Sequence, residues 1–452
     1  MGKIMELVMS LVNSMSVIMV LSYVLTRSHF YGDILEKRLS LRNRLLLIVI
    51  FGAFSIYGTL GGINLLGAIA NIRDLGPMIA GLVGGPLVGL GAGLIGAIHR
   101  LTLGGFTSYA CSLATVLAGL TGGLVYLQRQ GEFPRISTAV FLAAAIEIVH
   151  MGLVLLISKP FPQAVLLVEQ ICAPMILGNS AGMAVFAYIL TNLMKERATE
   201  VAKRQIEGEL HAARQIQMSI VPRLFPPYPE RPELEIHAVL EPAKEVGGDF
   251  YDFFFIDQEH FLFVVGDVSG KGVPASLFMA VTRTLIRSRT GPGCTPEEIL
   301  CTVNNELCRD NDTGMFVTVF CGILNTSSGE LLYSSGGHDA PCRLSATGID
   351  FLTPAKGLAL GAMEGAPYQK QTASLKPGET LVVYTDGVTE AMSRAEQFWG
   401  KDGLLQSLQN APGMAPSEIT AQVLHDLRHF ARNTAQWDDI TILALTFIGQ
   451  TN

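Results

Sequence analysis

The sequence has few charged residues and no excess of basic ones. Asp, Glu, Lys and Arg make up 16% of the 452 residues, and the formal net charge is -7. Proteins that bind nucleic acid normally present a basic face to the phosphates, so we expect neither DNA nor RNA as a partner. The seven cysteines show no CxxC spacing. Because the chain is far longer than the small secreted scaffolds that depend on disulfide bonds, we expect reduced thiols.

Apolar residues make up 49% of the chain and are concentrated in its first half. Six apolar stretches are each long enough to cross a bilayer as a helix, near residues 4–25, 43–63, 75–98, 105–127, 136–158 and 166–193. The first lacks a small-residue cleavage site, so we expect an uncleaved span. The apolar pattern stops after Lys195. We therefore predict an all-α, multi-span membrane domain (1–194), a helical linker (195–224) and a cytoplasmic domain (225–452).

The basic loops argue against six simple spans. The loop between the first two stretches should be cytoplasmic by the positive-inside rule, because it carries Arg27, Lys37, Arg38, Arg42 and Arg44. Six spans would place it on the opposite side from the C-terminal half. The third stretch has Gly84, Gly85 and Pro86 at its middle, where proline removes a backbone donor and glycine permits a reversal. Five full spans and one re-entrant hairpin would put both this loop and the C-terminal half in the cytoplasm.

Such a hairpin would gather polar residues on the outer side of the membrane. Asn71, Arg73 and Asp74 would lie on the same side as His99 and Arg100. Two arginines beside broken helices would suit a small anionic ligand. The alternative is that these residues only form polar loops at the level of the lipid headgroups.

Two ionisable residues fall within the fifth apolar stretch. Glu147 and His150 are one helical turn apart. Ionisable groups inside a membrane are energetically costly, so they are usually paired or functional. The pair is therefore either part of a site or a structural hydrogen bond.

The membrane half resembles a known receptor region. The segments NIRDLGPMIAGLVGGPLVGLGAGLIGAIHR and GGFTSYACSLATVLAGL carry the resemblance, which extends over about residues 30–195. Their pattern is similar to the five-transmembrane region of LytS-type sensor proteins. The resemblance implies an input domain for an external small metabolite, and it adds Cys111 and Ser112 to the candidate ligand pocket.

A heptad-like pattern follows the last apolar stretch. The four-three spacing is carried by Ile206, Leu210, Ala213, Gln217 and Ile220. This spacing is typical of a coiled-coil seam, here a short one, and predicts a homodimer contact that continues the last span into the cytoplasm. The alternative is a single amphipathic helix that packs on the C-terminal domain. Prolines from Pro222 onward end the helix.

The C-terminal half alternates short strands with helices, which is typical of an α+β domain with layered sheets. Asp249 opens one predicted strand and Asp267 closes the next, so a hairpin would bring the two carboxylates face to face. They would repel each other unless a cation lay between them. Asp386 follows another strand, and Asp438 with Asp439 opens the last one. Such carboxylates, without an HExxH motif or a Cys/His cluster, favour Mg²⁺ or Mn²⁺ and indicate a two-metal site for phosphoester hydrolysis.

Six motifs in order carry a second resemblance, over about residues 225–447. They are EPAKEVGGDFYDFF, VVGDVSGKGVPASLFMA, MFVTVF, SSGGHDAP, LVVYTDGVTEA and DDITIL. They resemble the RsbU and sporulation-type branch of the metal-dependent type 2C phosphatases. The resemblance implies a two-sheet β-sandwich flanked by helices, with two Mn²⁺ or Mg²⁺ ions. It also implies hydrolysis of phosphoserine or phosphothreonine by metal-activated water.

The same resemblance implies roles for individual residues. Asp249 and Asp267 would bridge the two ions and serve as the catalytic pair, with the Val268 carbonyl completing one metal's shell. Asp386 and Asp438 would bind the second ion. Asp438 is preferred over Asp439 because the family ligand begins the motif. The His338 motif also matches, without indicating a role.

We therefore expect a signal-transducing serine/threonine phosphatase in the bacterial inner membrane, with its catalytic domain in the cytoplasm. Its substrate, by resemblance, would be a phosphorylated regulator such as an anti-sigma factor antagonist. One alternative is a transporter or solute-binding membrane protein with an accessory phosphoprotein-binding domain, although no repeated half is evident. Another is a phosphatase fold that only binds phosphoproteins, against which the complete set of aspartates argues.

Overall fold

The computed structural model describes residues 16–17, 20, 40–66 and 68–449. Most of the first predicted span therefore lies outside the described residues, as do Arg27, Lys37 and Arg38 of the basic loop. The chain divides into two compact units, Met1–Lys203 and Arg204–Asn452. We describe each unit by itself.

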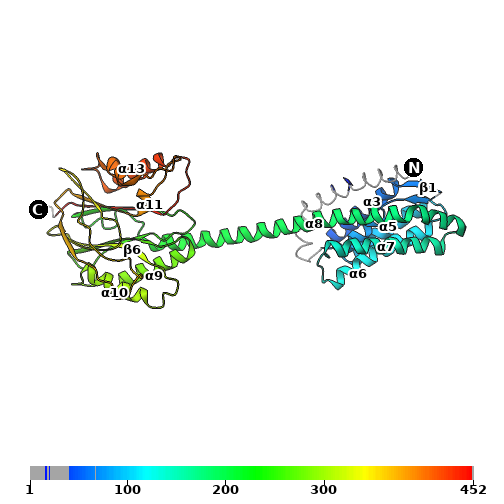
Figure 1. The fold of residues 1–452 in the computed structure, drawn as a ribbon, viewed down its shortest axis with the longest axis horizontal. Helices are drawn as coiled ribbons and strands as arrows, with labels where there is room; N and C mark the ends of the chain where they lie inside the picture. Colours follow the sequence, from blue (N-terminus) through cyan, green and yellow to red (C-terminus); the bar gives the residue numbers. More distant parts are fainter. Residues whose placement is uncertain (1–15, 18–19, 21–39, 67, 450–452) are drawn as a thin grey trace. The chain divides into compact units, whose positions relative to one another are not determined.

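The first unit is a helical bundle with one small hairpin (Figure 1). Its elements are α3 (Leu41–Leu60), β1 (Ile63–Leu65), β2 (Ala68–Ala70), α4 (Leu75–Gly84), α5 (Pro86–Thr102), α6 (Ser108–Gln128), α7 (Ile136–Ile157) and the first part of α8 (Phe161–Ile220). Among the described residues, α3, α6, α7 and α8 are long and apolar enough to cross a membrane. The expected all-α membrane bundle is therefore confirmed as an apolar helical bundle.

The third apolar stretch is interrupted where the glycine-proline sequence predicts it. Helix α4 ends at Gly84, and α5 begins at Pro86. Gly85 between them has φ 86°, a backbone conformation that glycine adopts without strain and other residues rarely do. Proline at the first position of α5 loses no helical hydrogen bond, since that N–H would have no partner within the helix. The stretch thus forms two short helices instead of one span.

Glycines let the two short helices pack closely against α6. A Cβ atom placed on Gly119 would lie 2.1 Å from the carbonyl oxygen of Gly89, and one on Gly81 would lie 2.4 Å from that of Gly119. Helices in a membrane gain most from such close backbone packing, because lipid supplies no hydrophobic drive for their association. The abundance of glycine in α4 to α6 is therefore a packing requirement.

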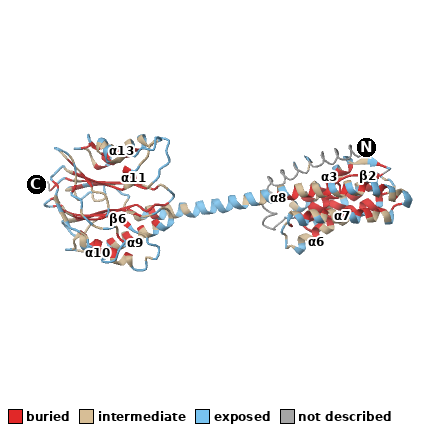
Figure 2. Ribbon diagram, in the orientation of Figure 1, coloured by how far each residue is buried: buried red, intermediate tan, exposed pale blue. Residues whose placement is uncertain are grey.

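Helix α8 continues without interruption from the apolar stretch into the charged segment that follows it. Most side chains between residues 195 and 216 are exposed (Figure 2), including those of Val201 and Ile206. Gln217 near its end is buried instead and contacts the second unit's loop at Gly247. The last turn of the predicted seam therefore packs on the C-terminal unit, as the single-helix alternative requires, while Ile206 remains exposed.

The second unit contains two five-stranded sheets with helices on their outer faces (Figure 1). One sheet has the order β10-β7-β6-β5-β4, and the other has the order β3-β12-β11-β8-β9, with all named pairs antiparallel. The bounds of the first sheet's strands are β4 (Phe250–Phe255), β5 (His260–Val268), β6 (Val317–Asn325), β7 (Glu330–Gly336) and β10 (Gln371–Ser374). Those of the second are β3 (Leu234–Glu241), β8 (Cys342–Ser345), β9 (Gly348–Phe351), β11 (Thr380–Tyr384) and β12 (Ile440–Phe447).

The helices complete the layers of this unit. Their bounds are α9 (Val273–Arg289), α10 (Pro296–Cys308), α11 (Asp386–Thr389), α12 (Gly400–Leu408) and α13 (Pro416–Phe430). Helices α9 and α10 cover the sheet that contains β5, while α13 covers β3 and β12 of the other. The strands read as near-continuous apolar runs, such as the fully buried TLVVY of β11, because they are covered on both faces. This is the two-sheet sandwich flanked by helices that the sequence predicts.

Candidate metal centre

Two aspartates meet at one end of the hairpin formed by β4 and β5. In its register Phe250 pairs with Gly266, so the next pair outward is Asp249 with Asp267. Asp249 is 1% exposed. Burial raises the pKa of Asp249 well above its usual value, and the nearby carboxylate of Asp267 raises it further. The predicted opposition of the two carboxylates is therefore present, together with the repulsion that it entails.

The two oxygens of Asp249 differ in their environment. Oδ2 accepts hydrogen bonds from the hydroxyls of Thr385 (2.8 Å) and Thr441 (2.7 Å). Oδ1 is buried and has no hydrogen-bond partner among the described residues. A buried carboxylate oxygen without a partner is costly, and a cation would remove that cost. The two threonines thus fix the carboxylate and leave one oxygen available.

Asp386 joins this group from the other sheet. It follows β11 and begins the short helix α11. Burial and the nearby carboxylates of Asp386 and Asp438 together raise the pKa of Asp267 to about 7. Burial likewise raises the pKa of Asp386 to about 6, with contributions from Glu390 and Asp438. Asp249, Asp267 and Asp386 are therefore disfavoured in their charged forms, with Asp438 close by, and a divalent cation would relieve this.

The two adjacent aspartates of the last motif have different surroundings. Asp439 is buried, and its Oδ1 accepts from the backbone N–H of Ala243 (2.7 Å) while its Oδ2 accepts from that of Gly248 (2.6 Å). The Asp438 side chain is 24% exposed, and its Oδ2 lies 3.1 Å from Nζ of Lys271. Asp439 is thus occupied in holding the loop before Asp249, and Asp438 is the more accessible carboxylate.

The remaining predicted ligand is a backbone group. Val268 is the buried last residue of β5, and a Cβ atom placed on Gly248 would lie 2.8 Å from its carbonyl oxygen. The close approach of the two segments therefore requires glycine at position 248. It brings this carbonyl next to the loop that leads into Asp249.

His338, whose motif indicated no role in the sequence, has a clear structural one. Its Nε2 donates to the backbone carbonyl of Tyr384 (3.0 Å), so its Nδ1 accepts from the hydroxyl of Thr318 (3.0 Å). Burial lowers the pKa of His338 to about 4, so the imidazole is neutral at physiological pH. The histidine links β6 to the end of β11, two residues before Asp386. Its motif was visible in the sequence, but the two partners are distant in the chain.

A cavity of about 380 Å³ adjoins Asp438. Its lining includes Gly387, Glu390, Arg428, Arg432 and Trp437. Lys271 lies near it, with Nζ 5.0 Å from the centre of the Trp437 ring. The cavity wall therefore carries basic and acidic groups together, since Arg428 pairs with Glu241, which also lines it. Arg432 and Lys271 lie on the side that would receive an anionic substrate.

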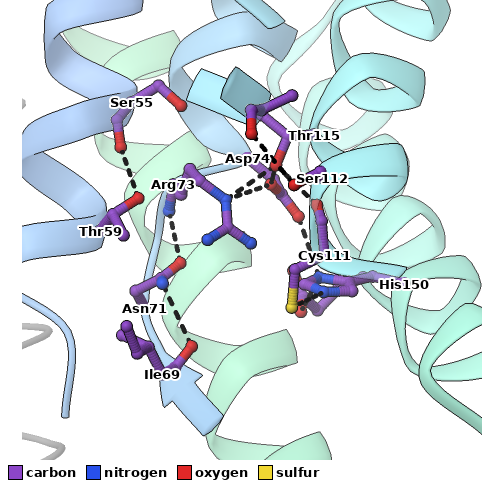
Figure 3. Close-up of polar contacts among 12 residues, drawn as sticks. Ser55, Thr59, Ile69, Asn71, Arg73, Asp74, Cys111, Ser112, Thr115 and His150 are labelled. Carbon is purple, nitrogen blue, oxygen red and sulfur yellow. Dashed lines mark hydrogen bonds and ion pairs between the residues drawn. The ribbon is translucent and has the colours of Figure 1, made fainter. Parts of the chain in front are cut away.

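The candidate ligand residues of the membrane unit are largely buried. Arg73 donates through Nε to the hydroxyl of Thr115 (2.8 Å), and its two terminal nitrogens have no hydrogen-bond partner among the described residues. The side chain of Asn71 accepts from the backbone N–H of Arg73 (3.1 Å). Figure 3 shows Cys111 and Ser112 with Arg73, and Thr115, which Arg73 contacts, also donates to the backbone carbonyl of Cys111 on α6 (2.9 Å). These residues thus form one polar cluster inside an apolar bundle.

Arg100 and His99 lie at the end of α5. Arg100 is 1% exposed and donates to the carbonyl of Gly104 (2.5 Å) and the hydroxyl of Thr107 (3.1 Å). Ser112 of α6 donates to the carbonyl of Ala97, which lies one turn before Arg100 on α5 (3.1 Å). His99 is partly exposed. Arg100 is therefore joined to the loop before α6, while His99 lies at the margin of this group.

Both halves of the chain match known families. Residues 257–448 match the family described as Stage II sporulation protein E (SpoIIE), and residues 28–193 match the family described as 5TMR of 5TMR-LYT. Both resemblances stated from the sequence are thereby confirmed. Asp249 precedes the matched range, whereas the other three predicted aspartates fall within it.

Individual relatives match part of the chain. The chain is 33% identical to Protein IcfG of Synechocystis sp. over 297 residues, covering 60% of this chain and 45% of that protein. It is 35% identical to Sensor histidine kinase BtsS of Escherichia coli over 190 residues, covering 41% and 34%. It is 28% identical to Phosphoserine phosphatase RsbU of Bacillus subtilis over 244 residues, covering 54% and 71%. The chain thus spans less than half the length of the first two relatives.

Proposed function

We propose that the chain, whose two halves match the SpoIIE family and the 5TMR of 5TMR-LYT family, is a membrane-bound, metal-dependent protein serine/threonine phosphatase controlled by an external small ligand. One observation carries the proposal: Asp249, Asp267, Asp386 and Asp438 lie together where the two sheets meet. The pKa values of the first three are raised, and Oδ1 of Asp249 is buried without a hydrogen-bond partner among the described residues. Such a group of carboxylates is stable in its charged form only with bound cations.

The donor set fits two Mn²⁺ or Mg²⁺ ions, since every available ligand atom is an oxygen. Asp249, Asp267 and the Val268 carbonyl would hold one ion, with the two carboxylates shared, and Asp386 with Asp438 would hold the second. Once bound, the ions would activate a water for attack on phosphorus and neutralise charge on the phosphoryl group.

The chain's own residues prepare this centre. Thr385 and Thr441 orient the Asp249 carboxylate, and Asp439 fixes the loop before it. Lys271 pairs with Asp438 and is available to attract the phosphate of an incoming substrate. These contacts pre-form the geometry before substrate arrives, which is the main contribution that a protein makes in phosphoryl transfer.

For the substrate we propose a phosphorylated regulatory protein, such as an anti-sigma factor antagonist. Support comes from the similarity to Phosphoserine phosphatase RsbU and from the open cavity beside Asp438, with Arg428 and Arg432 on its wall. For the input ligand we propose a small anion held near Arg73, whose terminal nitrogens lack partners, with Asn71, Arg100, Cys111 and Ser112 nearby. The similarity to Sensor histidine kinase BtsS supports a sensor role for this half.

We further propose that the protein lies in the bacterial inner membrane with its catalytic domain in the cytoplasm, and that it acts as a homodimer. The continuous helix α8 offers a route from the receptor to the catalytic loop, since Gln217 near its end contacts Gly247. Ile206, the exposed apolar residue of the predicted seam, would contribute to the dimer contact. The domain boundaries at 194 and 224 follow from the same assignment.

The test is phosphate release from a phosphoserine peptide by the full-length protein in nanodiscs, with Mn²⁺ or with EDTA. Turnover that requires Mn²⁺ supports the proposal. No turnover from folded, Mn²⁺-loaded protein would favour a domain that only binds phosphoproteins.

A further inference from the structure

A second cluster of ionisable side chains lies in the membrane unit (Figure 3). Asp74 precedes α4, while Glu147 and His150 lie one turn apart on α7. They are 4%, 1% and 2% exposed, respectively. Glu147 and His150 are thus in contact as the sequence predicts, but Asp74, far away in the chain, joins them.

The contacts within this cluster are short but do not form satisfactory hydrogen bonds. His150 Nδ1 lies 2.9 Å from Asp74 Oδ2 and 3.3 Å from Glu147 Oε1. Each of these three atoms is buried, and none of the described residues offers it a hydrogen-bond partner of acceptable geometry. One ring nitrogen carries at most one proton, so it cannot fully satisfy two carboxylates. Three orphaned atoms directed at one another mark a position where a bound cation would satisfy them all.

We infer that Asp74, Glu147 and His150 bind a divalent transition-metal ion, of the Zn²⁺ class, inside the membrane unit. One ligand atom from each residue lies within 4.8 Å of the others, which is the spacing of donors around a single ion. One imidazole and two carboxylates are a usual donor set for Zn²⁺ and for other first-row divalent ions. Three protein ligands leave a further position open for water or for an added donor.

The other ring nitrogen of His150 supports this assignment. Nε2 lies 3.4 Å from Sγ of Cys111. If Nδ1 binds the ion, Nε2 carries the proton and donates it to the sulfur, so both nitrogens have partners. Metal-binding histidines are regularly oriented by such a second contact. Cys111 therefore orients the histidine without itself binding the ion.

The competing explanation is a protonated His150 that bridges both carboxylates without metal. Arg73 also belongs to this arrangement, since its Nε lies 3.5 Å from Asp74 Oδ1. The two positive and two negative side chains would then sum to no net charge. This explanation leaves the poor hydrogen-bond geometry of Nδ1 unexplained. A divalent ion with neutral His150 would instead give the cluster a net positive charge, which an anionic donor at the open position would neutralise. The inference does not depend on phosphatase activity.

The experiment uses full-length protein in detergent, with Asp267→Ala as a common background to weaken metal binding in the phosphatase unit. The protein is stripped with chelator, loaded with Zn²⁺ or Co²⁺, freed of excess metal and analysed for bound ions per chain. We expect His150→Gln, Glu147→Gln and Asp74→Asn each to lose about one Zn²⁺ per chain. The Co²⁺-loaded parent should show the strong visible absorption of a low-coordinate site, which these three variants lose.

The controls are Glu169→Gln, which changes an exposed glutamate on α8, and Cys111→Ser. The first should bind as the parent does, and the second should bind about 10–100-fold more weakly, as expected for loss of an orienting contact. If His150→Gln does not give monodisperse protein, two other measurements decide the question. Glu147→Gln should lose the ion, and the X-ray absorption spectrum of the Zn²⁺-loaded parent should show a nitrogen ligand. Unchanged metal content and Co²⁺ absorption in folded variants would overturn the inference in favour of the protonated bridge.

Discussion

The side-chain amide of Gln217 engages both backbone groups of Gly247. Its Nε2 donates to the Gly247 carbonyl (2.7 Å), and its Oε1 accepts from the Gly247 N–H (3.1 Å). Gln217 lies near the end of α8, and Gly247 lies two residues before Asp249. A rotation or shift of this helix would therefore act directly on the loop that carries a proposed metal ligand.

Replacing Gln217 by Ala should weaken metal binding and lower turnover. The change leaves two backbone groups unpaired at a buried site, at a cost of about 1–3 kcal/mol each where water cannot replace the amide. We expect the Mn²⁺ concentration for half-maximal phosphatase activity to rise several-fold. Gln205→Ala, which changes an exposed glutamine on the same helix, is the matched control. An unchanged Mn²⁺ requirement in Gln217→Ala would show that α8 does not act on the loop before Asp249.

The two aspartates of the last motif should respond differently to substitution. Asp439→Ala removes the acceptor for the Ala243 and Gly248 N–H groups, so we expect a loss of about 2–4 kcal/mol in the free energy of unfolding. Asp438→Ala should leave the metal-free stability within about 1 kcal/mol, since its side chain is partly exposed, while abolishing Mn²⁺-dependent turnover. Denaturant unfolding measures the stability of each variant, and phosphate release measures its turnover. The reverse pattern would identify Asp439 as the ligand.

In EDTA, the stability of the C-terminal unit should fall as pH rises from about 4 to 7. The pKa of Asp267 is raised from 3.8 to about 7 in the folded state, mainly by burial. Within this window the folded state retains a proton that the unfolded state has lost, so deprotonation favours unfolding. Both tryptophans, Trp399 and Trp437, lie in this unit, so their fluorescence follows its unfolding in the full-length protein.

Asp267→Asn is the variant for this test. It should show a smaller loss of stability across the window, because the amide does not titrate, while the contribution of His338 is common to both proteins. Mn²⁺ should restore the stability of the parent at pH 8 and not that of the variant. Equal pH slopes in parent and variant would show that Asp267 does not carry the effect.

Gly119→Ala should destabilise the membrane unit. The added methyl would lie 2.1 Å from the carbonyl oxygen of Gly89, so α5 and α6 must move apart, at a cost of about 1–3 kcal/mol. Gly152→Ala on α7 is the control, because its added methyl meets nothing within 4 Å. The fraction of protein that stays monodisperse after heating in detergent should fall for the first variant only. Equal losses would mean that close glycine packing does not hold these helices.

The strand-end aspartates were predictable because hairpin geometry is local. A short turn between two apolar strands fixes which residues face each other. The sequence alone therefore predicts Asp249 opposite Asp267, and the register of the hairpin agrees. The break at Gly85 was predictable for the same reason, since glycine and proline act on the backbone where they stand.

Contacts between distant segments were not predictable in this way. The approach of Asp74 to His150 depends on how α4 and α7 pack, and no spacing in the sequence links them. The role of His338 depends on two partners from different strands. The buried Gln217 occupies a position that the heptad pattern assigns to a dimer seam, because the pattern identifies a covered face without identifying what covers it.

The central claim is that the converging carboxylates form a hydrolytic two-metal centre. The most direct test is the rate of phosphate release from a phosphoserine peptide at saturating Mn²⁺, measured for full-length parent, Asp267→Asn and Asp257→Asn. Asp257 lies exposed at the opposite end of the same hairpin. We predict that Asp267→Asn lowers the rate by more than about 100-fold while Asp257→Asn stays within about twofold. Equal rates for the two folded variants would contradict the account.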